Sequence, residues 1–192
     1  QAESHEAVAR AVHADAPLIM AEEAKEIGAA LVHYSTDYVF YRLSSTSYSE
    51  TDATNPINVY GRTKLEGERA IEQSGVPHLI FRTAWVYGRE GKNFLLTILR
   101  LATQREELRI VRDQIGAPTS SREIAAATTQ ILTQLLAQDD GSESGISSIA
   151  QKSGIYHLTA AGETNWYEFA RAILEEAAAH PRDDSWFVSA TS

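Results

Sequence analysis

The sequence predicts an α/β fold built on a parallel sheet. Amphipathic segments of helical length alternate along the chain with short apolar runs, which is the pattern of repeated strand–helix units. The apolar fraction of 43% and the charged fraction of 22% are those of a folded globular protein. A length of 192 residues suits one large domain, or one domain with a small lobe.

In the first half of the chain we expect two helical regions and one buried strand. A helical pattern covers residues 4–28, and we expect a break at residues 15–17, where Asp15 can cap a second helix and Pro17 can lie in its first turn. The apolar run 30–34 predicts a strand. A polar loop over 41–55 and a helix over 56–74 follow.

The second half continues the alternation. Residues 139–153 are rich in Ser, Gly and Asp and are interpreted as an exposed loop. The remaining apolar patterns predict strands over 76–86, 108–111 and 155–158, and helices over 93–105, 122–137 and 166–179.

Composition excludes several classes of function. Acidic residues outnumber basic ones by 26 to 17, and the net charge of −9 repels a phosphate backbone, so we expect no nucleic-acid partner. With no Cys, a Cys nucleophile, disulfides and a thiolate zinc site are excluded. No apolar run has the length of a membrane span, and no signal peptide or metal-ligand cluster is recognisable, so we expect a cytoplasmic protein without a metal.

Three segments combine polar and aromatic residues where predicted elements begin or end. One strand leads into Tyr-Ser-Thr-Asp-Tyr-Val-Phe at residues 34–40, and another into Arg-Thr-Ala-Trp-Val-Tyr-Gly at 82–88. A helix begins near Tyr-Gly-Arg-Thr-Lys at 60–64. The carboxyl ends of parallel strands meet at one edge of a sheet, where active sites form.

Tyr60 and Lys64 lie four residues apart, so a helix places them on one face. We expect the ammonium of Lys64 to lower the pKa of the Tyr60 phenol and make it a usable proton donor. Thr36 can supply a second hydroxyl to polarise a carbonyl. This set suits carbonyl reduction, with the hydride supplied by a cofactor.

Each of these residues also has a structural interpretation. Tyr60 and Lys64 can belong to a solvated helical face, Thr36 can cap a turn, and Asp37 can be an ordinary turn residue. Trp85 can pack in the core. His33 and His78 lie in predicted strands and are interpreted as structural.

The motifs together resemble those of the extended short-chain dehydrogenases/reductases, and within them the dTDP-4-dehydrorhamnose reductase family. The resemblance rests on the Tyr-x-x-x-Lys pair and on the blocks at 32–40, 50–52, 56–61, 64–68, 82–87 and 113–119. It implies a partial Rossmann-type, doubly wound parallel sheet with a smaller substrate-binding lobe. Residues 1–88 would form the C-terminal part of the dinucleotide-binding domain, and residues 89–192 the substrate-binding lobe with elements returning to the sheet.

The resemblance also implies roles for individual residues. Thr36, Tyr60 and Lys64 would be catalytic, and Tyr60 and Lys64 would also contact the cofactor, NADPH or NADH. The substrate, dTDP-4-dehydro-L-rhamnose, would be reduced at its C4 ketone to dTDP-L-rhamnose. The residues implied to bind it are Asp37, Tyr38, Trp85, Asn93, Phe94, Gln114 and Thr119.

The sequence departs from that family in one respect that affects binding. The family begins with a glycine-rich turn that binds the dinucleotide phosphates, and no such motif occurs here, so we expect residues 1–192 alone to bind cofactor weakly or not at all. Two alternatives stay open: a nucleotide-sugar epimerase or dehydratase of the same superfamily, and a non-catalytic dinucleotide-binding regulatory subunit. A homodimer is also left open.

Overall fold

The computed structural model describes residues 2–41, 46–137 and 146–180. The chain divides into two compact units. The first unit comprises the described residues of Gln1–Thr83 and Ala127–Leu158, and the second those of Ala84–Ala126 and Thr159–Ser192.

A parallel sheet forms the centre of the first unit. Its three strands are β1 (Leu31–Thr36), β2 (His78–Thr83) and β6 (Gly154–His157), in the order β1-β2-β6. The pairing runs from Leu31 opposite His78 to Thr36 opposite Thr83, so β1 and β2 end side by side. The predicted α/β class with a parallel sheet is confirmed.

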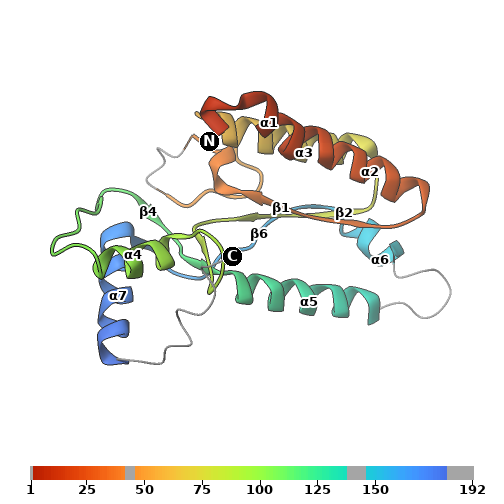
Figure 1. Ribbon diagram of the computed structural model, residues 1–192. Helices are drawn as coiled ribbons and strands as arrows, with labels where there is room; N and C mark the ends of the chain where they lie inside the picture. Colours follow the sequence, from red (N-terminus) through yellow and green to blue (C-terminus); the bar gives the residue numbers. More distant parts are fainter. Residues whose placement is uncertain (1, 42–45, 138–145, 181–192) are drawn as a thin grey trace. The chain divides into compact units, whose positions relative to one another are not determined.

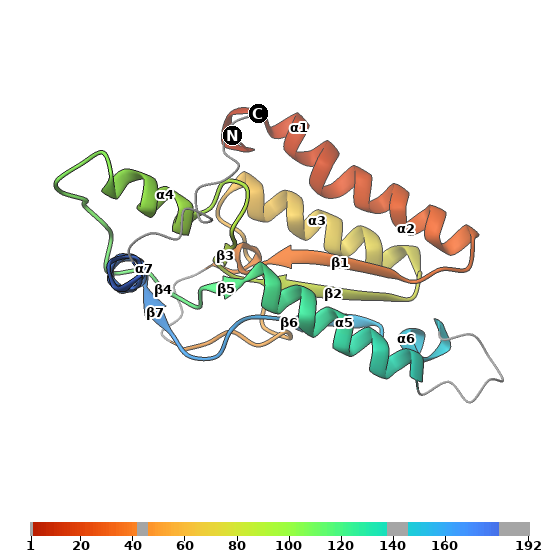
Figure 2. The same cartoon turned by 60° about the horizontal axis from the view of Figure 1, so that its bottom comes forward.

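Helices cover both faces of this sheet (Figure 1). On one face, α2 (Ala16–Glu26) and α3 (Val59–Ser74) enclose a core that includes Ile71 and Ile80. On the other, α6 (Ile146–Gln151) and the part of α5 (Ser121–Ala137) that belongs to this unit pack on Leu79 and Phe81. The turned view in Figure 2 shows these two helices on the side of the sheet away from α2 and α3. Neighbouring residues of β2 thus face opposite layers, as pleated strands require.

The N-terminal helix continues where we expected a break. After η1 (Ala2–Ser4) and α1 (Glu6–Arg10), a π-helical segment, η2 (Ala11–Asp15), leads directly into α2. Asp15 has helical backbone angles, and its side chain makes no capping hydrogen bond. Pro17 has no N–H to donate to the carbonyl of His13, and the wider π turn accommodates this loss without ending the helix.

The His13 carbonyl oxygen lies instead against Gly67 of α3, where a Cβ atom would collide with it. Gly67 is therefore the residue that lets the two helices approach this closely.

The expected loop over 139–153 is wrong in part. Residues 138–145 lie outside the described ranges, but Ile146–Gln151 form α6. Ile149 is buried against Leu79 and Phe81, and this contact fixes a short helix that its Ser-rich sequence does not favour by itself.

The second unit is built on two helices, α4 (Phe94–Ala102) and α7 (Trp166–Ala179), which share a core around Ile98 and Ile173. Two short strand pairs accompany them: β3 (Val86–Tyr87) with β5 (Thr119–Ser120), and β4 (Ile115–Gly116) with β7 (Thr164–Asn165).

The predicted strand over 108–111 is absent from this described segment. Leu108 and Ile110 pack on the core of α4 and α7, so their alternation reflects contact with helices and not strand pairing. Among the helices that the structure describes, none combines the length and apolarity needed to cross a bilayer.

Candidate functional site

The end of β1 meets the beginning of α3 in the first unit. Thr36 caps the short helix η3 (Asp37–Val39), because its hydroxyl accepts a hydrogen bond of 3.2 Å from the Tyr38 N–H. The carbonyl of Tyr38 lies directly against Gly61 in the first turn of α3, where a Cβ atom would collide with it. This close packing brings the Ser-Thr-Asp-Tyr segment beside Tyr60.

Tyr60 is half-buried between two aromatic neighbours. Its ring makes edge contacts with Tyr38 at 5.7 Å and with His13 at 5.2 Å between ring centres. Burial raises the pKa of its phenol, and the nearby carboxylate of Asp37 adds to that rise, while a hydrogen bond with Thr36 opposes it. The surroundings of the phenol therefore favour its protonated form, and the Thr36 hydroxyl is the group that favours its ionised form.

Lys64 lies on the same side of α3 as Tyr60, but its ammonium points toward β1. Its Nζ donates to the Tyr34 carbonyl oxygen at 2.6 Å and to His33 Nε2 at 3.1 Å. Burial lowers the pKa of Lys64 to about 8, and the carboxylate of Glu68 opposes that change. The expectation that Lys64 lowers the pKa of Tyr60 is wrong here, because the long side chain carries its charge to the strand.

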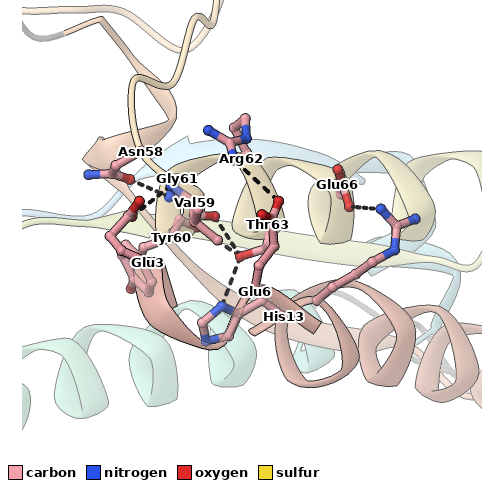
Figure 3. A network of polar contacts seen from close by, with 11 residues as sticks. Glu3, Glu6, His13, Asn58, Val59, Tyr60, Gly61, Arg62, Thr63 and Glu66 are labelled. Carbon is pink, nitrogen blue, oxygen red and sulfur yellow. Dashed lines mark hydrogen bonds and ion pairs between the residues drawn. The ribbon is translucent and has the colours of Figure 1, made fainter. Parts of the chain in front are cut away.

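The N-cap residue of α3 and side chains from the N-terminal segment hold its first turns. Asn58 accepts from the Gly61 N–H at 2.7 Å, and the Glu3 carboxylate accepts from the Val59 N–H at 2.8 Å. Two of the N–H groups that a helix start leaves unpaired are thereby satisfied. Figure 3 shows these contacts beside two further pairs along α3, Glu6 with Arg62 and His13 with Thr63. Glu66 of α3 forms a third pair, with Arg10 at 2.8 Å.

A buried ion pair links α3 to the end of β2. Arg82, 3% exposed, and Glu68, fully buried, form two parallel hydrogen bonds of 3.0 and 2.7 Å. Arg82 also donates to the Glu50 carbonyl oxygen at 3.4 Å. The Glu50 carboxylate accepts from the His157 N–H at 2.9 Å, a bond that lowers its pKa. Together these contacts fix the loop before α3 to the strand ends.

The remaining candidates belong to the second unit, and three of them gather around Trp166. Trp85 is 8% exposed, has a positive φ of 46°, and stacks on Trp166 with ring centres 3.6 Å apart. Gly116 lies directly against the indole ring of Trp85. Phe94 packs on Trp166 at 4.4 Å, and Gln114 accepts a hydrogen bond of 3.2 Å from the Trp166 indole N–H.

Asn93 and Thr119 use their side chains for local backbone contacts in the second unit. Asn93 caps α4 by accepting from the Leu96 N–H at 3.1 Å, and donates to two carbonyl groups of the preceding turn. The buried Thr119 hydroxyl donates to the Ala117 carbonyl oxygen and accepts from the Ala160 N–H. These contacts shape the turns that carry the two residues.

Residues 1–190 match the family described as the RmlD substrate binding domain. The chain belongs to this family.

Curated relatives and solved structures extend the match. The chain is 46% identical over 180 residues to dTDP-4-dehydrorhamnose reductase of Burkholderia thailandensis, covering 94% of this chain and 58% of the relative. It is 44% identical over 177 residues to the reductase of Escherichia coli K12, covering 92% and 56%. It thus spans little more than half the length of these relatives.

Among solved structures, a dTDP-4-dehydrorhamnose reductase of Bacillus anthracis in complex with NADP matches with a TM-score of 0.78 and 32% identity, over 93% of this chain and 58% of that one. A second, from Clostridium acetobutylicum, has a TM-score of 0.80 and 33% identity, over 92% and 57%.

Sequence reasoning missed three residues that contact the candidates. His33 was interpreted only as structural, although strand alternation places it with Leu31 on the face turned to α3. His13 was missed because we expected the helix to break at residues 15–17, and a broken helix gave no reason to place His13 beside Tyr60. Trp166 begins a correctly predicted helix, but nothing in its spacing indicated stacking on Trp85.

Proposed function

We propose that this protein is an NAD(P)H-dependent dTDP-4-dehydrorhamnose reductase, which reduces the C4 ketone of dTDP-4-dehydro-L-rhamnose to dTDP-L-rhamnose. The observation that carries the proposal is the half-buried phenol of Tyr60 beside Thr36 at the end of a parallel strand. The family membership and the reductases similar to this chain support it.

Tyr60 is the proton donor in this proposal. A phenol is protonated at neutral pH, and burial raises the pKa of Tyr60 further, so the proton is present when a ketone oxygen arrives. The Thr36 hydroxyl donates to the Asp37 carboxylate at 3.2 Å, and as negative charge develops on the phenol oxygen it can turn its proton to that oxygen and stabilise it. Tyr38 and His13 hold the ring in place by edge contacts.

The dinucleotide, NADPH or NADH, would supply the hydride. Tyr60 and Lys64 are the residues of this chain that would contact it. Lys64 fits this role, since its contacts in the described part of the chain use two of three ammonium N–H groups. The third suits a ribose hydroxyl. The NADP bound to the Bacillus anthracis reductase supports NADPH as the cofactor.

The nucleotide-sugar would contact Asp37 and Tyr38 in the first unit, and residues of the second unit. There the proposal assigns binding to Trp85, Phe94 and Gln114 around Trp166, and to the turns held by Asn93 and Thr119. The first unit would then bind the cofactor and supply Asp37 and Tyr38 to the sugar, and the second unit would supply the other sugar-binding residues. The proposal includes a cytoplasmic enzyme and leaves a homodimer to be tested by its mass in solution.

Net cofactor oxidation tests the proposal. A reductase consumes one NADPH for each dTDP-4-dehydro-sugar that it converts, whereas an epimerase or dehydratase that retains its NAD(H) shows no net oxidation. Stoichiometric oxidation with formation of dTDP-rhamnose is the expected result. Product formation without net oxidation favours the epimerase or dehydratase. Dinucleotide binding without turnover, in a complex with another enzyme, favours the regulatory subunit.

A further inference from the structure

His33 lies on β1 opposite the middle of α3. Its neighbour Val32 packs toward α5 and α6, while Leu31 packs in the core between the sheet and α2 and α3. Strand alternation therefore turns the imidazole of His33 toward α3. There its Nε2 lies 3.1 Å from the Nζ of Lys64.

The direction of this hydrogen bond follows from the chemistry of the two groups. An ammonium has donors only, so Lys64 donates and His33 Nε2 accepts, which requires an imidazole without a proton at Nε2. Burial, together with the charges of Lys64 and His13, lowers the pKa of His33 to about 4. The imidazole is therefore neutral at physiological pH, with its proton on Nδ1.

Two other titratable residues, His13 and Glu68, lie near the hydrogen bond between Lys64 and His33. Both have other partners, so neither replaces His33 as the acceptor. His13, from η2, accepts or donates at Thr63 Oγ1 at 3.0 Å, and the Thr63 hydroxyl itself donates to carbonyl oxygens of Val59 and Tyr60. His13 Nδ1 is thus the donor to Thr63. Glu68, one turn beyond Lys64, is already held by the two bonds of Arg82.

We propose that His33 is a positioning residue for Lys64. Its neutral imidazole and the Tyr34 carbonyl hold the ammonium at a fixed point against β1, and these two contacts, the ones that Lys64 Nζ makes within the described residues, leave one N–H for a hydroxyl of a dinucleotide. A lysine side chain has four flexible carbons, and fixing its end before the ligand arrives removes an entropic cost from binding. The identity of the ligand in this inference rests on the proposed function, whereas the contact between His33 and Lys64 is independent of it.

Substitutions at His33 that remove the hydrogen-bond acceptor, shorten the side chain or keep both features test the inference. His33→Gln keeps an acceptor near the position of Nε2, whereas His33→Leu removes it. His33→Asn is a second polar variant whose shorter side chain cannot reach Lys64. His5→Gln, at an exposed histidine, is the control.

Two measurements on the protein as its gene encodes it give the outcome. The first is the titration of Lys64, followed by NMR of its ¹³Cε. The Leu and Asn variants should lower the midpoint, because the ammonium loses an acceptor, and the Gln variant should stay near the parent. The second is the Kd for NADPH, which should rise about tenfold in the Leu and Asn variants and less than about threefold with Gln, the worth of one charge-assisted hydrogen bond.

Unchanged midpoints in the Leu and Asn variants would overturn the inference, as would a Gln variant that behaves like Leu. If the midpoints shift as expected but the parent binds no NADPH, the proposed function fails while the role of His33 in holding Lys64 stands.

Discussion

The buried pair of Glu68 and Arg82 offers a test of how the strand ends are held. With Glu68 fully buried and Arg82 3% exposed, Glu68→Leu leaves a guanidinium charge in the interior without its partner. Such a loss costs about 3–5 kcal/mol, a large share of the roughly 5–15 kcal/mol that stabilises a typical domain. At a urea dependence of about 2 kcal/mol per molar, the unfolding midpoint should fall by about 2 M.

The assay is urea unfolding of the parent, Glu68→Leu, Arg82→Met and the double variant. The double variant should recover most of the loss, because removing both charges also removes the cost of burying them. Glu107→Leu is the control, since its pair with Arg109 is highly exposed and should contribute less than about 1 kcal/mol. A single variant that unfolds like the parent, or a double variant with the sum of both losses, would refute the reasoning.

Three further predictions concern stability. Gly67→Ala should cost about 1–3 kcal/mol, because the new Cβ meets the His13 carbonyl oxygen, and Arg69→Ala on the exposed side of α3 is its control in thermal unfolding. Asn93→Ala should cost about 1 kcal/mol through the lost cap of α4, measured in the same way, and an unchanged Tm would contradict that cap. His33 has a pKa of about 4 in the fold against 6.5 in the unfolded chain, so the unfolded state binds more protons between these values and stability falls as the pH falls from 6.5 to 4. His33→Gln should remove up to about 3 kcal/mol of that loss, and equal acid sensitivity in parent and variant would contradict it.

The spacing of apolar residues predicted most helices and strands, because burial of one face of an element determines that spacing. The helix over 166–179 was predicted with the bounds that α7 has, and the strand–helix order of the first unit followed from the same patterns. The segment 108–111 misled, because alternating apolar residues can contact helices as well as a partner strand. The π turn before Pro17 was missed, because its cause is one absent N–H and the packing of His13 on Gly67.

For the candidate site, the sequence interval predicted the helix face on which Tyr60 and Lys64 lie, but not where the charge of Lys64 lies. The four-residue interval correctly placed Tyr60 and Lys64 on one face of α3. It could not show where a flexible lysine carries its ammonium, and that depends on His33 and on the Tyr34 carbonyl, which come from another element. The stacking of Trp85 on Trp166 joins residues 81 positions apart in the chain (166 − 85), beyond the reach of any local pattern.

The proton donated by Tyr60 is the claim on which the proposed function depends, and single-turnover oxidation of NADPH by the Tyr60→Phe variant measures it most directly. With saturating dTDP-4-dehydro-sugar, the account predicts a rate reduced about 10²- to 10⁴-fold, the usual contribution of a general acid, while NADPH still binds. A variant that binds NADPH and oxidises it at a rate near that of the parent would contradict the assignment of Tyr60 as the proton donor.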